Sequence, residues 1–228
     1  MTQPTRRTRS DDAAELGPLH GGRHNLDPEV VAFNQRERLL AAIAEVVAER
    51  GYNQTTVALV THAASISRRT FYERFADKEG CFVAAYEAVD EHLWAMLTEA
   101  MATAGGWAEQ VARAFSELLG FFAAYPHLAR LYWVEATVVG EGTMALREQG
   151  AQRLIVLLAA GRGERADERE LPEGIEEALA GGVMTLIGRH VQNGEAAELQ
   201  RFAPALIEFA LAPYLGFERA RELAAAYA

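Results

Sequence analysis

Seven polar side chains lie close together in one short stretch, and their chemical types suit contact with a nucleic acid. They are Ser67, Arg68, Arg69, Thr70, Tyr72, Glu73 and Lys78. An arginine can donate two hydrogen bonds to guanine or pair with a phosphate, and serine and threonine hydroxyls can reach either group. Lys78 is the only lysine of the chain. The stretch is therefore a candidate DNA-contact surface, provided that helices present it outward.

The residues before this stretch predict a long helix from about Pro28 to Arg50. Leu39, Ile43 and Val47 recur at helical spacing and form one apolar stripe. Gly51 follows, and a glycine at this place typically ends a helix in a left-handed conformation. A second, short helix is predicted after Thr55-Thr56, which can supply its N-cap.

A third helix is predicted to begin after Ser67. Phe71 and Phe75 are four residues apart, so they share a face that packs inward and leaves the polar residues outward. Asp77 can cap a fourth helix that starts at Lys78. The free N–H groups at the start of the third and fourth helices both favour phosphate.

The sequence here resembles the signature of the TetR (tetracycline-repressor-like) family over residues 35–82. The resemblance is carried by Gly51-Tyr52, Thr55-Thr56-Val57, the run from Ala64 to Phe75, and Asp77-Lys78-Glu79. It implies a homodimer whose N-terminal domains each read one half of an operator in double-stranded DNA. It also implies a C-terminal domain that binds a small molecule and dimerises.

The resemblance also assigns roles to single residues. Tyr72 and Lys78 match positions that usually contact phosphate, and the run Ser67–Thr70 matches the start of the recognition helix. Thr56 and Glu73 complete the predicted DNA-binding set. The family usually has glycine in the turn where this chain has Ser65, which tolerates a positive φ less well.

The whole pattern predicts an all-α protein in three parts. Residues 1–26 are rich in Thr, Gly, Pro and charge and are expected to form a disordered arm. Its arginines belong either to a solubilising tail or to an arm that enters a minor groove. Residues 27–80 form the helix-turn-helix domain. A linking helix joins it to a helical bundle over 81–228, with helices expected near 78–103, 106–124, 127–139, 142–160, 173–193, 202–215 and 217–226 and a surface loop over 161–172.

The charge of the chain is unevenly distributed. The first 80 residues carry eleven basic and eleven acidic side chains, whereas residues 81–228 carry eleven and twenty-one, which accounts for the whole net charge of −10. Phosphate repels an acidic body. The C-terminal part is therefore expected to face away from DNA.

Large apolar residues of the C-terminal part are candidates for the lining of a ligand pocket. The predicted ligand-binding residues are Trp94, Phe122, Trp133, Glu135 and Met184. Ligand pockets are mainly apolar, so a largely apolar effector is expected, although each aromatic residue can also be ordinary core. Glu135 is the one acid in an apolar stretch and either faces solvent, caps a neighbouring helix or orients a ligand.

Two segments near the C-terminus suit a dimer interface. Over 173–193, a band of small residues runs beside an apolar stripe, and an apolar face continues over 202–215. The alternative is that both segments only close the core of one chain.

The sequence gives little support for an enzyme. Its six histidines lack metal-ligand spacing, and there is no phosphate loop, nucleophile elbow or dinucleotide fingerprint. No cofactor is predicted. Cys81 is the single cysteine, and no apolar stretch is long enough for a signal peptide or membrane span, so a cytoplasmic location without a membrane partner is expected.

The predicted function is a ligand-responsive repressor that a small apolar molecule releases from a palindromic operator. The alternative is a helical protein that keeps this fold but acts through a protein partner or an unrecognised enzymatic activity.

Overall fold

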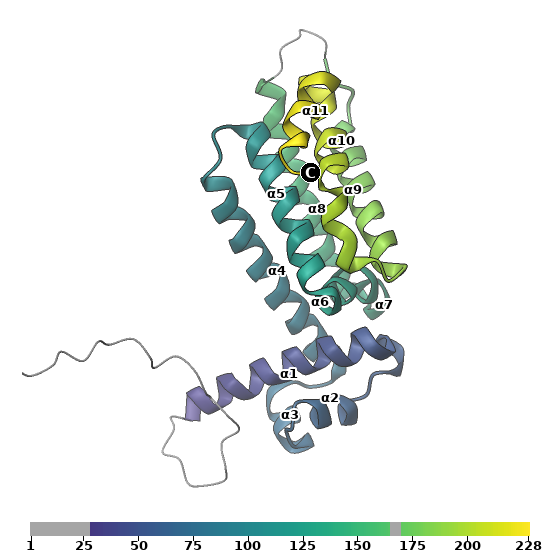
Figure 1. Cartoon of the computed structure of the whole chain (residues 1–228). Coiled ribbons are helices and arrows are strands. Elements are labelled where there is room, and N and C mark those ends of the chain that lie inside the picture. The colour runs from purple at the N-terminus through teal and green to yellow at the C-terminus, as the bar shows by residue number, and fades with distance from the viewer. Residues whose placement is uncertain (1–27, 165–169) are drawn as a thin grey trace, which may run out of the picture.

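The computed structural model describes residues 28–164 and 170–228, and every regular element in these two ranges is helical. The N-terminal unit consists of α1 (Pro28–Arg50), a short 3-10 turn (Tyr52–Gln54), α2 (Val57–Ala63) and α3 (Arg68–Arg74). Figure 1 shows this unit below a larger bundle, with α2 and α3 at the end farthest from the C-terminal helices. The predicted arm over 1–26 lies outside the described residues.

Side-chain caps explain where the short helices begin. The Thr56 hydroxyl accepts a hydrogen bond from the Leu59 N–H at 3.3 Å, and the Ser67 hydroxyl accepts one from the Thr70 N–H at 3.1 Å. Each cap satisfies a backbone donor that the first helical turn leaves unpaired. The predicted starts of the second and third helices are confirmed.

Two turns of the N-terminal unit have a positive φ. Ser65, between α2 and α3, has a φ of 51°, in the region that favours glycine. Gly51 has a φ of 79° and a ψ of 156°. The expected left-handed helical conformation at Gly51 is therefore wrong, because the chain leaves α1 in an extended conformation that only glycine adopts readily.

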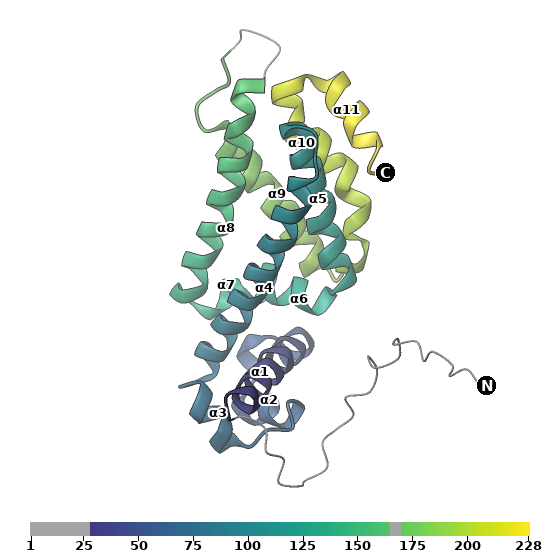
Figure 2. The same ribbon diagram turned by 90° about the vertical axis from the view of Figure 1, so that its left-hand side faces the viewer.

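Helix α4 (Lys78–Ala102) connects the N-terminal unit to the body. The Asp77 carboxylate caps it by accepting from the Gly80 N–H at 2.8 Å. Figure 2 shows α4 leaving the unit beside α1 and continuing between α5 and α8. Cys81 is fully buried in this helix, and burial raises the pKa of its thiol to about 12, so it is a core residue without thiolate reactivity at neutral pH.

The body is a bundle of helices whose bounds lie close to the predicted ones. They are α5 (Trp107–Ala124), α6 (Pro126–Arg130), α7 (Ala136–Val139), α8 (Glu141–Ala159), α9 (Ile175–Gln192), α10 (Ala203–Leu215) and α11 (Phe217–Ala225). The segments 160–164 and 196–202 are 3-10 turns. The helix expected over 127–139 is interrupted, because residues Leu131–Glu135 between α6 and α7 form a π-helical turn.

An ion pair closes the body at the end remote from the N-terminal unit. Arg162 donates two hydrogen bonds to the Glu176 carboxylate, at 2.7 and 2.8 Å, and the Tyr214 hydroxyl donates a third at 3.1 Å. The Arg162 guanidinium holds the pKa of Glu176 below its usual value. Arg162, at the start of the predicted loop 161–172, is thus attached to α9 through Glu176.

Across both described ranges, none of the helices combines the length and the apolar content that a membrane crossing requires.

Candidate DNA-binding surface and ligand cavity

Helix α3 presents two opposite faces, as the spacing of its residues predicts. Phe71 is fully buried, whereas Tyr72 beside it is 58% exposed. Phe75 follows the last helical residue, is half-buried and packs against Phe71 with a ring-centroid distance of 5.8 Å. The aromatic pair therefore holds α3 against the core and leaves its other face free.

The predicted contact residues of α3 lie on this free face. Ser67 and Thr70 join their hydroxyls at 2.9 Å at the start of the helix. Arg68 is exposed, and the side chain of Arg69 is 90% exposed and pairs with Glu73 at 3.1 Å one turn later. These side chains can rearrange toward a base or a phosphate without any loss of core packing.

The two remaining residues of the predicted set have structural contacts of their own. The exposed Thr56 caps α2. The Lys78 ammonium donates to the backbone carbonyl of Tyr52 at 2.8 Å and lies 3.8 Å from the centroid of the Tyr52 ring. Burial lowers the pKa of Lys78. Lys78 thus ties the start of α4 to the turn after α1 and is only half-buried, close to the predicted contact surface.

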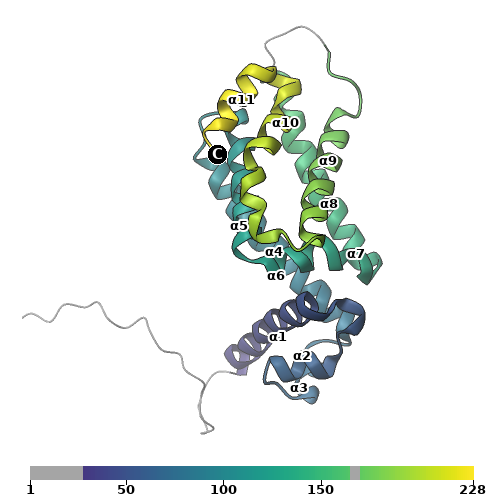
Figure 3. The same ribbon diagram turned by 45° about the vertical axis from the view of Figure 1, so that its right-hand side comes forward.

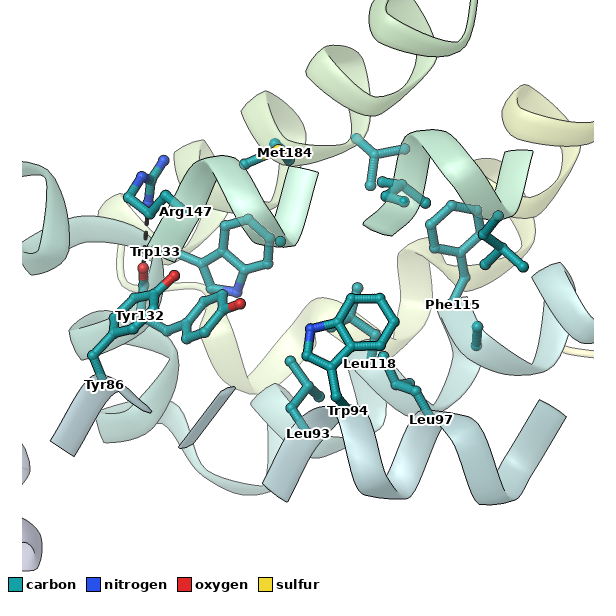
Figure 4. Close-up of a pocket in the computed structure, with 15 residues that line it drawn as sticks. Tyr86, Leu93, Trp94, Leu97, Phe115, Leu118, Tyr132, Trp133, Arg147 and Met184 are labelled. Carbon is teal, nitrogen blue, oxygen red and sulfur yellow. Dashed lines mark hydrogen bonds between the residues drawn. The ribbon is translucent and has the colours of Figure 1, made fainter. Parts of the chain in front are cut away.

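The body contains an apolar cavity between α4, α5, α8, α9 and the π turn. The cavity itself has a volume of about 70 Å³, and the empty space between its walls reaches about 700 Å³ when the solvent at its mouth is included. Figure 4 shows the aromatic side chains and Arg147 around it. The lining residues are Tyr86, Leu93, Trp94, Leu97, Ala114, Phe115, Leu118, Tyr132, Trp133, Arg147, Gly150, Leu154, Leu157, Val183 and Met184.

Trp94, Trp133 and Met184, all predicted as ligand-binding residues, line this cavity. Phe122 does not line it. Its fully buried ring packs against Tyr132 and Trp133 with centroid distances of 5.4 and 5.7 Å, and it supports them from the core.

Glu135 lies away from the cavity, at the junction with the N-terminal unit. Its carboxylate accepts a hydrogen bond from the Tyr52 N–H at 2.9 Å and pairs with Arg130 at 2.9 Å. Its side chain is only 6% exposed. The expectation that Glu135 faces a ligand is wrong. Of the alternatives, the cap of a neighbouring helix is closest to the structure, because Glu135 accepts from the first N–H of the 3-10 turn after α1.

The π turn explains why Glu135 points away from the cavity. In an α-helix, residues three apart share a face, so Glu135 would point the same way as Tyr132. A π turn is wider and rotates the following side chains relative to the preceding ones. Tyr132 and Trp133 therefore face the cavity while Glu135 faces Tyr52.

A buried acid stands behind the cavity wall and is fully paired. Asp90 accepts a hydrogen bond from the Tyr132 hydroxyl at 2.7 Å and from Arg153 at 2.8 Å. Burial raises the pKa of Tyr132 well above its usual range, so this tyrosine stays a neutral donor. The Asp90 cluster fixes the orientation of Tyr132 in the wall.

The sequence analysis did not predict several lining residues, although helical periodicity would have indicated some of them. Arg147, Gly150, Leu154 and Leu157 follow at intervals of three and four along α8 and so share one helical face. The face was overlooked because an arginine and a glycine interrupt its apolar character.

The outer surface of α9 and α10 carries apolar and small side chains. Figures 1 and 3 show the two helices as neighbours on the side of the body away from α4. Ala178, Gly181 and Thr185 are exposed on α9, and Phe209 is 47% exposed on α10. Most of the predicted band of small residues thus faces outward. Gly182 instead faces Phe209 of the same chain, where an added Cβ would lie 3.1 Å from the ring.

Comparisons with known proteins agree with this architecture. The family model described as "Bacterial regulatory proteins, tetR family" matches residues 39–85. No curated protein matches the chain in sequence.

Solved regulators share the fold over most of their length. FadR of Bacillus halodurans, a fatty acid degradation regulator, is 18% identical with a TM-score of 0.66 over 79% of this chain and 94% of its own. FadR of Bacillus subtilis, solved with stearoyl-CoA, is 17% identical with a TM-score of 0.66 over 79% and 98%. KstR2 of Mycobacterium tuberculosis, a ketosteroid transcriptional regulator, is 17% identical with a TM-score of 0.59 over 75% and 92%. Residues 39–85 thus match the DNA-binding domain of tetR-family bacterial regulatory proteins, and the helical body shares its fold with solved transcriptional regulators.

Proposed function

We propose that the chain is a homodimeric repressor that leaves a palindromic operator when a small, largely apolar molecule fills the cavity. The observation that carries the proposal is the course of α4. The helix begins at Lys78, which is bonded to the DNA-binding unit, and four turns later its Trp94 lines the cavity. A ligand that displaces Trp94 therefore acts on the same rigid element that positions α3.

The solved relatives support an apolar effector. One of them holds stearoyl-CoA, and another is named for ketosteroids, and both names describe molecules with large apolar parts. Thermodynamic linkage adds a requirement. An effector that weakens operator binding must itself bind more weakly to the DNA-bound protein, by the same factor.

The first test of the proposal is DNA binding. We expect the protein to retain a near-palindromic sequence from random fragments, because a two-fold dimer presents two copies of α3. Affinity should fall steeply between about 50 and 200 mM salt as phosphate contacts release counterions. Sequencing of the retained fragments and a salt titration measure both effects, and retention without sequence preference would contradict the operator.

Dimerisation through α9 and α10 can be tested at Gly181. A Cβ there meets nothing within 4 Å, so Gly181→Glu disturbs no contact within one chain. In the proposed dimer, it buries an unpaired charge from each subunit, which costs several kcal/mol. We expect the dimer dissociation constant, measured by sedimentation, to rise by about 100-fold or more.

Gly163→Glu is the matched control, since Gly163 is also exposed and an added Cβ there would meet nothing within 4 Å. It should sediment as the unmodified protein does. A Gly181→Glu protein that remains a tight dimer would place the interface on another surface.

A further inference from the structure

Two hydrogen-bond donors at the cavity have no partner. The indole N–H groups of Trp94 and Trp133 are shielded from solvent and make no hydrogen bond with any residue that the structure describes. The Tyr86 hydroxyl is also shielded from solvent and lies beside the hydroxyl of Tyr132. Native proteins pair most such buried groups, so an unpaired set at one cavity calls for an explanation. Burial raises the pKa of Tyr86 to about 12, which keeps this hydroxyl a donor throughout the physiological range.

The charged group at the cavity is also a donor. Arg147 lies on α8 and donates to the backbone carbonyl of Tyr132 at 3.3 Å. Within the two described ranges, no carboxylate lies within ion-pair distance of Arg147. The acid behind the wall, Asp90, is already paired with Tyr132 and Arg153. The cavity thus offers unpaired donors and a positive charge.

These donors lie toward one end of the cavity. Figure 4 shows the Trp94 nitrogen on the edge of its ring that faces Trp133 and the two tyrosines, with Arg147 beyond them. Phe115 and Leu97 lie on the other side of Trp94. One end of the cavity is therefore rich in donors, and the other is formed by hydrocarbon.

We propose that the cavity binds a compact apolar carboxylate, with its carboxylate toward Trp133, Tyr86 and Arg147 and its hydrocarbon part toward Phe115 and Leu97. A carboxylate accepts several hydrogen bonds and would pair as an anion with Arg147. A hydrocarbon would leave both indole donors unpaired, and an amine would add a second positive charge. The inference rests on the proposed function in that it names the class of effector.

The test compares four probes that share one apolar body: 4-phenylbutyrate, its methyl ester, butylbenzene and 4-phenylbutylamine. Tryptophan fluorescence and calorimetry measure their dissociation constants on the free protein without DNA. We expect the acid to bind about tenfold or more tightly than butylbenzene, with the ester between them and the amine weakest. A hydrogen bond to a charged group contributes enough for this difference.

Two variants locate the carboxylate. Arg147→Met keeps an unbranched apolar stem and removes the charged guanidinium, and Trp133→Phe keeps an aromatic ring and removes its N–H. Each should weaken binding of the acid by about tenfold and change binding of butylbenzene by less than about threefold. Helical circular dichroism shows that each variant folds, and Tyr86→Phe provides a third variant that removes a single oxygen.

Three outcomes would overturn the inference. They are equal binding of acid and amine, no binding of any probe, and variants that weaken acid and hydrocarbon alike. All of these measurements are made without DNA. They can therefore fail while operator binding holds, and failure of the operator experiment leaves the probe series intact.

Discussion

The double substitution Arg69→Ala and Tyr72→Ala is expected to weaken operator binding by about 100-fold or more while the fold and the dimer persist. Both side chains lie on the free face of α3 and are largely exposed, so their loss changes the free energy of unfolding by less than about 0.5 kcal/mol. Each lost contact to DNA costs about 1–3 kcal/mol, and two such losses multiply in the affinity.

The single variants should differ in kind. Tyr72→Ala removes a predicted phosphate contact and should weaken all sequences alike, whereas Arg69→Ala should also relax base preference. Fluorescence anisotropy with operator and scrambled DNA at one salt concentration separates the two effects. The matched control, Arg219→Ala with Tyr125→Ala, removes an exposed arginine and an exposed tyrosine from the body. Equal affinity of the test and control proteins would remove α3 from the interface.

The DNA-binding unit was predictable because its signals are short-range. Ser67 caps the helix that begins at the next residue, and Phe71 packs on Phe75 four positions away. The positive φ at Ser65 was expected from the family resemblance, because the family usually has glycine in this turn. Such features depend on neighbours within one or two turns, so their sequence pattern and their structure coincide.

The cavity and the junction were predictable only in part, because they depend on contacts between distant segments. Trp94 and Trp133 could be proposed from their size, yet nothing near Phe122 indicated that it would support the wall from behind. Glu135 meets Tyr52 across 83 positions of sequence. The direction of the Glu135 side chain depends on the π turn at Leu131–Glu135. An α-helical periodicity places this side chain on the wrong face of the helix.

The contacts of Glu135 suggest a second connection between the cavity and the DNA-binding unit. Trp133 lines the cavity, and Glu135 lies two residues later in the same π turn. Its carboxylate holds the Tyr52 N–H, and the Tyr52 carbonyl in turn accepts from Lys78. π turns inside helices frequently lie at functional sites. A ligand that shifts Trp133 would thus move the turn after α1 as well as α4.

We therefore expect Glu135→Ala to lower the free energy of unfolding by about 2–3 kcal/mol and to loosen this junction. The substitution leaves a buried N–H and one arginine without partners, and the cost stays below that of a fully buried pair because the Arg130 side chain is 38% exposed. Hydrogen exchange at the Tyr52 amide should become at least about tenfold faster. Glu176→Ala is the matched control, because Glu176 is equally buried and is also paired with an arginine, but at the far end of the body. It should lower the free energy of unfolding by a similar amount. After correction for this lower global stability, the Tyr52 amide should exchange no faster than in the unmodified protein. If both variants speed exchange at Tyr52 equally, Glu135 only supports the fold, and α4 alone connects the cavity to the DNA-binding unit.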